Sequence, residues 1–291
     1  MEIGAMSFGA WSRLNIDAAA LGTVGVQDTK GHLMKTTTSS DGTIIAYDRL
    51  GEGPPIVLVC GGSVDRMSNA GLAGELAADL TVYNFDRRGR GDSGDTAPYA
   101  VERELEDIAA MIEAADGSAY LYGTSSGAAL AMDAAAEGLP IEKLVLWEPP
   151  YSVNGRPDLP ADTATVYRDL VDAGRRGEAV EYFMAKVVGL PPEFVEGARQ
   201  APWWAQQEAL AHTLAYDATI MGDYTIPAER AKKVSVPTIV IDGEASFPFL
   251  HETADALAAL IPNAQRRTLA GQEHNVDPAD LAPVITEFLR S

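Results

Sequence analysis

The residues best placed to do chemistry form a glycine-flanked serine motif near the middle of the chain. Residues 123–127 (GTSSG) follow a short apolar run and precede an alanine-rich segment. A strand that turns sharply into a helix holds the central residue in a strained backbone conformation and exposes its side chain. The residues two before and two after this position crowd together, so both must be glycine. We therefore predict that Ser125 is a nucleophile.

The same turn favours a reaction that develops negative charge on an oxygen atom. The N-terminus of the following helix would lie beneath Ser125, and the free N–H of Ser126 would stabilise an oxyanion together with the helix dipole. Ser126 is thus expected to act through its backbone. The alternative is a glycine-flanked turn whose serine only caps the helix. The apolar strand before the motif and the alanine-rich helix after it favour the nucleophile.

A serine nucleophile needs a base, and the base needs a carboxylate that orients it. Of the four histidines, His274 lies in a loop between the last predicted strand and the last predicted helix. A base in such a loop can reach over the serine, and a histidine that follows the serine matches the usual chain order for this motif. We therefore predict that His274 is the base. His212 and His251 are interpreted as structural, and His32 lies in the N-terminal segment.

Composition limits the class of protein. The chain has 291 residues, and its 42 acidic and 22 basic residues give a net charge of −20. This charge argues against a nucleic-acid surface and against tight membrane binding, and no apolar run approaches the ~18 residues of a membrane span. The single cysteine, Cys60, allows no intrachain disulfide, favours a cytoplasmic location and is interpreted as a buried hydrophobic residue. Histidine and cysteine show no metal-ligand spacing, so no metal or other cofactor is expected.

Apolar strands alternate with helical patterns over most of the chain, which predicts an α/β protein with a mostly parallel sheet covered by helices on both faces. The predicted strands are 43–49, 55–60, 81–85, 119–122, 144–147, 236–241 and 265–269. The predicted helices are 69–80, 99–115, a segment that starts at 128, 250–261 and 278–289.

Residues 151–232 break this alternation, because their pattern is almost entirely helical. An all-helical block inserted between two sheet strands predicts a lid over the carboxyl edge of the sheet, where open α/β sheets place their sites. The core is then formed by residues 34–150 and 233–291. Three aromatic residues of the lid, Phe183, Trp203 and Trp204, are candidates to line an apolar substrate pocket, or they pack the lid against the core.

Together these features resemble the α/β-hydrolase superfamily, of the type with a serine nucleophile and a helical lid. The matching segments are residues 60–62 (CGG, where the family often has His-Gly-X), 86–93 (DRRGRGDS), 123–127 and 271–274 (GQEH). The resemblance implies the α/β-hydrolase fold, and a second oxyanion N–H from the loop after the third strand, best matched by Gly62, with Gly61 as the alternative. It also implies that residues 86–93 form a structural loop near the site.

The sequence departs from the family at the carboxylate. The commonest acid of the family follows the strand at 237–241 in a pattern like Gly-Glu-X-Asp, but here the last position is Ser246. Some members, resembling haloalkane dehalogenases, place the acid one strand earlier, where this chain has Glu148. A right-handed crossover through residues 128–141 would put that strand beside the strand that ends in the serine motif. We therefore predict that Glu148 is the acid, with Asp242 and Glu244 as alternatives.

The function predicted from the sequence is a cofactor-free, carboxylesterase-like serine hydrolase. Its expected substrate is a small, mostly apolar ester or lactone, cleaved through an acyl-enzyme, with neither nucleic acid nor membrane as a partner. A perhydrolase or haloperoxidase-like activity on the same triad is one alternative. A non-catalytic hydrolase-fold protein that binds a small ligand is the other, although the presence of both Ser125 and His274 argues against it. The sequence does not indicate an oligomeric state.

Residues 1–33 lack the patterning of the rest of the chain, and ordinary strand patterning begins after Met34. We interpret this segment as a vector-derived or mis-started leader, with a genuine extension as the alternative. A variant that begins at Met34 is therefore expected to keep its melting temperature and its esterase rate. A loss of more than roughly 2 kcal/mol in the free energy of unfolding, measured by denaturant titration, would show that the segment packs as structure.

Overall fold

The computed structural model describes residues 34–160 and 162–291, so the predicted leader at 1–33 lies outside the described residues. An eight-stranded sheet forms its centre, with strand order β1-β2-β4-β3-β5-β6-β7-β8. Only the first two strands run antiparallel to their neighbours, and the others pair in parallel. The strands are β1 (Lys35–Thr38), β2 (Ile44–Leu50), β3 (Pro55–Val59), β4 (Thr81–Phe85), β5 (Ala119–Thr124), β6 (Ile141–Trp147), β7 (Thr238–Gly243) and β8 (Ala264–Leu269).

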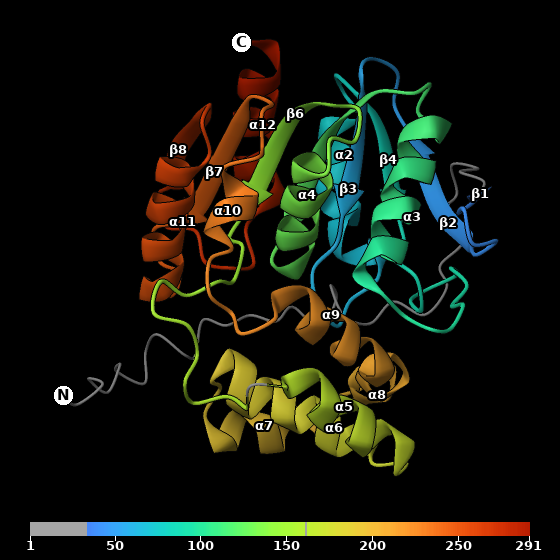
Figure 1. Ribbon diagram of the computed structural model, residues 1–291, viewed down its shortest axis with the longest axis vertical. Coiled ribbons are helices and arrows are strands. Elements are labelled where there is room, and N and C mark those ends of the chain that lie inside the picture. The colour runs from blue at the N-terminus through green and yellow to red at the C-terminus, as the bar shows by residue number, and fades with distance from the viewer. Residues whose placement is uncertain (1–33, 161) are drawn as a thin grey trace.

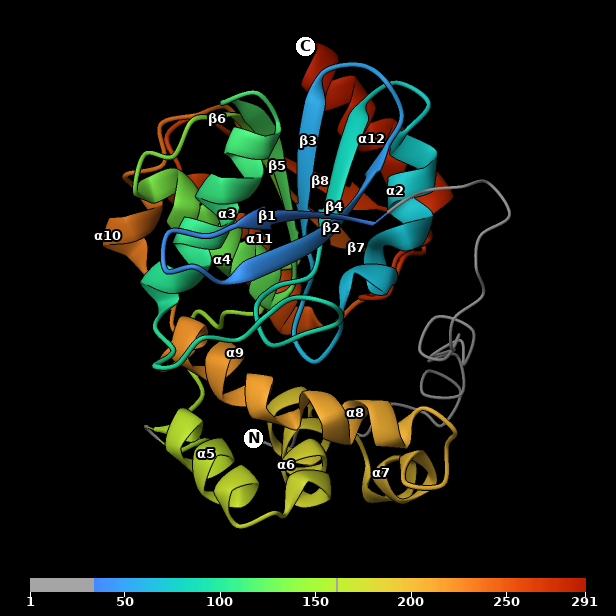
Figure 2. The ribbon, with the colours of Figure 1, turned by 90° about the vertical axis from the view of Figure 1, so that its right-hand side faces the viewer.

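Helices cover both faces of this sheet (Figures 1 and 2). One face packs against α3 (Val101–Ala114), α4 (Ser126–Ala136), α10 (Ala228–Ala231) and α11 (Pro248–Leu260), and the other against α2 (Ala70–Leu76) and α12 (Pro278–Arg290). Side chains of β3 alternate between the two apolar clusters, Val57 and Val59 on one face and Ile56 and Leu58 on the other. The predicted α/β class with a mostly parallel, doubly covered sheet is confirmed.

The helical pattern between β6 and β7 forms a separate layer of helices. These are α5 (Thr163–Asp172), α6 (Arg176–Tyr182), the π-helix η2 (Phe183–Val188), α7 (Pro192–Ala198), α8 (Trp204–Leu210), the 3₁₀ turn η3 (Ala211–Thr213) and α9 (Leu214–Met221). They enclose an apolar cluster of their own. Figure 1 shows this layer beyond the carboxyl ends of the strands, with α9 nearest to the sheet. We refer to α5 through α9 as the helical block.

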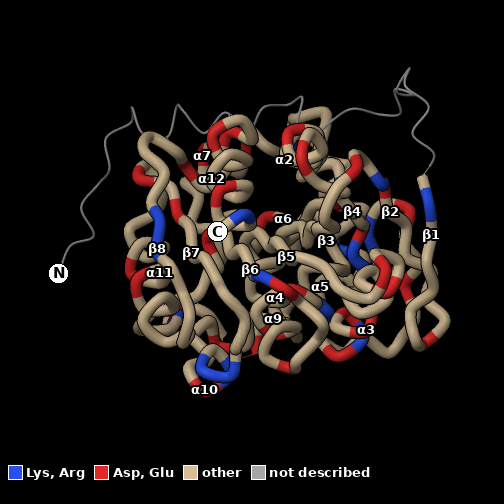
Figure 3. Tube along the Cα trace, turned by 90° about the horizontal axis from the view of Figure 1, so that it is seen from above, with Lys and Arg blue, Asp and Glu red and all other residues tan. Residues whose placement is uncertain are grey.

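The protein carries more acidic than basic residues, and both kinds lie on its surface. Figure 3 shows acidic residues around the outline, on α3 and α11 among others, and smaller basic groups such as those at β8 and α10. Among the described residues, every helix is too short or too polar to cross a bilayer.

The side chain of Cys60 lies just beyond β3 and is fully buried. Burial raises the pKa of this thiol to about 11. The residue is therefore the buried hydrophobic side chain that the sequence predicts, and its thiol is poorly suited to act as a nucleophile.

Candidate active site

Ser125 stands at the sharp turn between β5 and α4. Its φ of 54° and ψ of −128° place it outside the regions that ordinary residues prefer, at a cost of about 1–3 kcal/mol. A β-carbon added to Gly123 would lie 2.4 Å from the carbonyl oxygen of Gly127, and one added to Gly127 would lie 2.3 Å from the carbonyl oxygen of Cys60. The two glycines are therefore required by close backbone contacts, and the predicted strand–turn–helix geometry is present.

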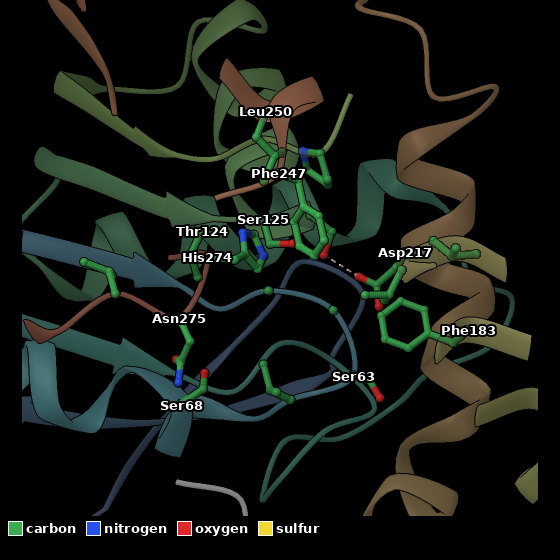
Figure 4. Close-up of a pocket in the computed structure, with 18 of the residues that line it drawn as sticks. Ser63, Ser68, Thr124, Ser125, Phe183, Asp217, Phe247, Leu250, His274 and Asn275 are labelled. Atoms are coloured by element: carbon green, nitrogen blue, oxygen red, sulfur yellow. Dashed lines mark hydrogen bonds between the residues drawn. The ribbon is translucent and has the colours of Figure 1, made fainter. Parts of the chain in front are cut away.

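His274 approaches this turn from the loop between β8 and α12. Its Nδ1 lies 2.5 Å from Oε2 of Glu148, and Figure 4 shows its ring beside Ser125. The indole Nε1 of Trp147 donates to the carbonyl oxygen of His274 at 2.9 Å, which fixes the loop. When Nδ1 donates to the carboxylate, the opposite nitrogen, Nε2, carries a lone pair that can accept a proton from a serine.

The carboxylate of Glu148 is fully buried at the carboxyl end of β6. This strand pairs with β5, with Trp147 opposite Thr124, so the adjacency expected from the right-handed crossover is observed. Besides His274, the carboxylate accepts hydrogen bonds from the backbone N–H of Gly243 at 2.8 Å and from Oγ of Ser246 at 3.0 Å. These donors offset the cost of burying a charge and fix the direction of the carboxylate.

The two alternative acids lie elsewhere and have other partners. Asp242 is buried and binds both Arg266 and His251. Burial raises the pKa of Asp242, but hydrogen bonds from Arg266 and His251 outweigh it, and the net pKa lies below the ordinary value. Glu244 accepts a hydrogen bond from the backbone N–H of Gly271 at 3.0 Å. The structure thus brings Glu148, and neither alternative, to the imidazole of His274.

The two predicted oxyanion donors, Gly62 and Ser126, lie in the wall of the cavity that contains Ser125. Gly62 and Ser126 line the same cavity as Ser125 and His274, and neither backbone N–H donates a hydrogen bond to another described residue. The loop after β3 runs directly against the nucleophile, because a β-carbon added to Gly61 would lie 3.1 Å from Cβ of Ser125. Two backbone N–H groups without a partner among the described residues therefore belong to residues that line this cavity.

The cavity over Ser125 has a volume of about 410 Å³, within the range of small-molecule sites. Its wall is mostly apolar, and the helical block contributes much of it through the π-helix η2 and the segment in which α8 begins. Residues from these elements and from the start of α11 include Phe183, Met184, Val187, Trp203, Phe249 and Leu250. The site therefore lies between the helical block and the carboxyl ends of the strands.

Of the three aromatic candidates from the helical block, Phe183 and Trp203 line the cavity and Trp204 does not. The ring of Trp204 packs inside the block, near Gly177 and with its centroid 6.4 Å from that of Trp203. Neighbouring positions on a helix point about 100° apart, so adjacent tryptophans do not face the same space. Trp204 therefore does not line this cavity, and its packing within the helical block corresponds to the alternative that the sequence left open.

Asp217 is a residue of the site that the sequence does not reveal. It lies on α9, is 7% exposed, and lines the cavity close to Phe183 (Figure 4). Its Oδ1 accepts a hydrogen bond from Oγ of Ser126 at 2.8 Å, across 91 residues of chain. An aspartate inside a helical pattern is ordinarily read as solvent-facing, and no local motif indicates that it reaches the nucleophile turn.

Comparison with known proteins places this fold in a family. Residues 56–284 match the model of the alpha/beta hydrolase family. The chain therefore belongs to the α/β-hydrolase family, as the resemblance in its sequence implies.

Individual relatives differ in how far the similarity extends. An alpha/beta hydrolase from Sphaerobacter thermophilus, known from a crystal structure, is 54% identical in sequence to this chain. The alignment covers 88% of this chain and 100% of the other, and the two structures superpose with a TM-score of 0.83. A thermophilic esterase from Thermogutta terrifontis shares the fold, with 24% identity, a TM-score of 0.68, and coverage of 89% of this chain and 98% of its own. N-formylmaleamate deformylase from Pseudomonas putida is 36% identical over 38% of this chain and 43% of its own. The chain spans less than half the length of the curated relatives it matches.

Proposed function

We propose that the protein is a serine hydrolase that cleaves a carboxylic ester or lactone of a small, mostly apolar molecule. The observation that carries this proposal is the hydrogen bond between His274 and buried Glu148, with the imidazole beside Ser125 at the floor of an apolar cavity. A strained serine, a base and an orienting carboxylate are the parts that acyl transfer requires. The volume of about 410 Å³ supports a small substrate.

In the proposed mechanism, Oγ of Ser125 attacks the carbonyl carbon while Nε2 of His274 accepts the hydroxyl proton. The carbonyl oxygen becomes an oxyanion held by the N–H groups of Gly62 and Ser126. When the tetrahedral intermediate collapses, the leaving alkoxide takes the proton from His274 and an acyl-enzyme remains on Ser125. Water, deprotonated by His274, then attacks the acyl carbon, and Ser125 recovers its proton as the carboxylic acid forms. Glu148 holds the imidazole in one tautomer and stabilises its positive charge throughout.

A fluorophosphonate probe tests the reaction class, because only an activated serine is labelled. We expect stoichiometric labelling at Ser125, found by peptide mass spectrometry. Turnover of p-nitrophenyl esters and lactones of graded size should be highest for small apolar acyl groups. N-formyl amides belong in the panel, because one relative is a deformylase. Folded protein that is neither labelled nor active would favour a non-catalytic ligand-binding protein, and peracid formation that outpaces hydrolysis would favour a perhydrolase.

A further inference from the structure

Two buried arginines connect the loop after β4 to the site. Arg87 and Arg90 belong to residues 86–93, the segment interpreted from the sequence as a structural turn, and they are 0% and 1% exposed. Asp86 does hold the turn together, since it accepts from the backbone N–H groups of Arg66 and Asp92. The side chains of Arg87 and Arg90, however, leave the turn and reach the loop that follows β3.

Both arginines donate to the carbonyl oxygen of Gly61, Arg90 through a short hydrogen bond and Arg87 at 3.4 Å. The peptide between Gly61 and Gly62 is trans, since the only cis bond among the described residues precedes Pro98. In a trans peptide, the carbonyl and the next N–H point in opposite directions. The N–H of Gly62 therefore points away from the guanidinium groups, and a cation on the carbonyl also polarises the peptide and makes that N–H a stronger donor.

Asp217 connects Ser126, whose N–H is the second proposed oxyanion donor, to the same arginines. Oδ1 of Asp217 accepts hydrogen bonds from Arg87 and Arg90, each at 2.9 Å, and from Oγ of Ser126 at 2.8 Å. A β-carbon added to Gly62 would lie 3.1 Å from Oδ2 of Asp217, so this carboxylate also packs against the first donor. One cluster thus holds both residues whose N–H groups are the proposed oxyanion donors.

The charges of this cluster balance. A lone carboxylate beside the cavity would repel a developing oxyanion, but Asp217 is paired with both arginines, and Arg87 also binds Glu104 on α3 through two hydrogen bonds. Burial raises the pKa of Asp217, yet the charges of Arg90 and Arg87 outweigh it and keep the net pKa below the ordinary value. Two cations and two anions therefore lie together, and no net negative charge faces the reacting oxygen.

We propose that Arg90, supported by Arg87 and Asp217, is a positioning residue that aims and strengthens the oxyanion donor of Gly62. The inference rests on the proposed serine-hydrolase function and goes beyond it by assigning a catalytic purpose to a turn that otherwise only shapes the fold. Arg90 acts through the peptide of Gly61, so it should matter for the tetrahedral state and little for substrate binding.

The test compares Arg90→Lys with a matched control, Arg88→Lys. Arg88 is equally buried in the same turn and pairs with Asp107 and Asp41, but none of its hydrogen bonds reaches the loop after β3. Affinities are measured for phenylboronic acid, which forms a tetrahedral adduct with an activated serine, and for benzyl alcohol, which occupies the cavity without an oxyanion. A lysine keeps the charge but lacks the fork that serves Asp217 and Gly61 together.

We expect Arg90→Lys to lower kcat and the phenylboronic acid affinity by the same factor, about tenfold to a hundredfold, since loss of a whole donor costs about 10² to 10³ in kcat. KM and the benzyl alcohol affinity should change less than about threefold, and Arg88→Lys should leave both affinities unchanged. Equal weakening of both ligands in Arg90→Lys, or unchanged phenylboronic acid affinity, would overturn the inference. A wild-type protein that binds benzyl alcohol but not phenylboronic acid would instead overturn the proposed function, and the inference with it.

A second variant covers the case in which Arg90→Lys does not fold. Removing one partner of a buried ion pair leaves an uncompensated charge, whereas replacing both partners is often tolerated. The double substitution Arg90→Gln with Asp217→Asn leaves Arg87 paired with Glu104 and keeps the cluster neutral. Its phenylboronic acid affinity should fall at least as far as that of Arg90→Lys, and an unchanged affinity would overturn the inference.

Discussion

Replacement of Ser125 by alanine is expected to abolish fluorophosphonate labelling and to lower kcat by on the order of 10⁶, the scale seen when a nucleophilic serine is removed. The reason is chemical, because alanine offers no oxygen that can form the acyl-enzyme. The fold should remain, since the strained φ of 54° is set by the glycine contacts around the turn and alanine can occupy it as serine does. Mass spectrometry of the labelled protein, steady-state kinetics and thermal unfolding measure these effects.

Ser126→Ala is the matched control for this experiment. The hydroxyl of Ser126 donates to Asp217, but its proposed role in the reaction is through its backbone N–H, which alanine retains. The variant should therefore be labelled normally and lose less than about tenfold in kcat, about 1.4 kcal/mol. If the two serine variants behave alike, Ser125 is not the nucleophile.

The second large effect is expected at the carboxylate, where Glu148→Gln should lower kcat by about 10³ to 10⁴. The glutamine amide can offer an N–H to Nδ1 of His274, which then becomes the acceptor. Nε2 then carries the hydrogen and cannot take a proton from Ser125. The amide oxygen can still accept from Gly243 or Ser246, so the free energy of unfolding should change by less than about 2 kcal/mol. Pre-steady-state kinetics should show that acylation is slowed, and labelling by fluorophosphonate should be slowed as well, because both need an activated Ser125.

Glu244→Gln and Asp242→Asn are the controls for the acid. Each should reduce kcat by less than about tenfold, because neither carboxylate contacts His274. Asp242→Asn should also destabilise the fold, because it leaves the charge of Arg266 without its main partner. A loss of activity in either variant as large as that of Glu148→Gln would show that the acid is misassigned.

Much of this molecule can be predicted because its signals are local. The sharp turn at Ser125 is specified by two glycines and by the change from an apolar strand to an alanine-rich helix, all within a dozen residues. The position of Glu148 follows from a handedness rule, since a right-handed crossover places β6 beside β5. The placement of His274 follows from the order of strands and helices along the chain.

The rest depends on contacts that join distant parts of the chain. Nothing near Asp217 indicates that it will meet Ser126, and nothing near Arg90 indicates that its side chain will hold the carbonyl of Gly61 rather than the turn it belongs to. The orientation of Trp204 likewise depends on how α8 is rotated within the helical block. Such details are decided by tertiary packing, which the pattern of one element does not contain.

The hydrogen bond from Ser246 to Glu148 has an evolutionary consequence. The carboxylate sits at the end of β6, yet two of its donors, the N–H of Gly243 and the hydroxyl of Ser246, come from the end of β7. The ends of two neighbouring strands thus meet at one point beside the imidazole, and an acid can be attached from either side. Two substitutions, an aspartate at Ser246 and a small residue at Glu148, would therefore move the acid from one strand end to the other. The nucleophile has no such freedom, because among the described residues its strand–turn–helix frame exists only between β5 and α4.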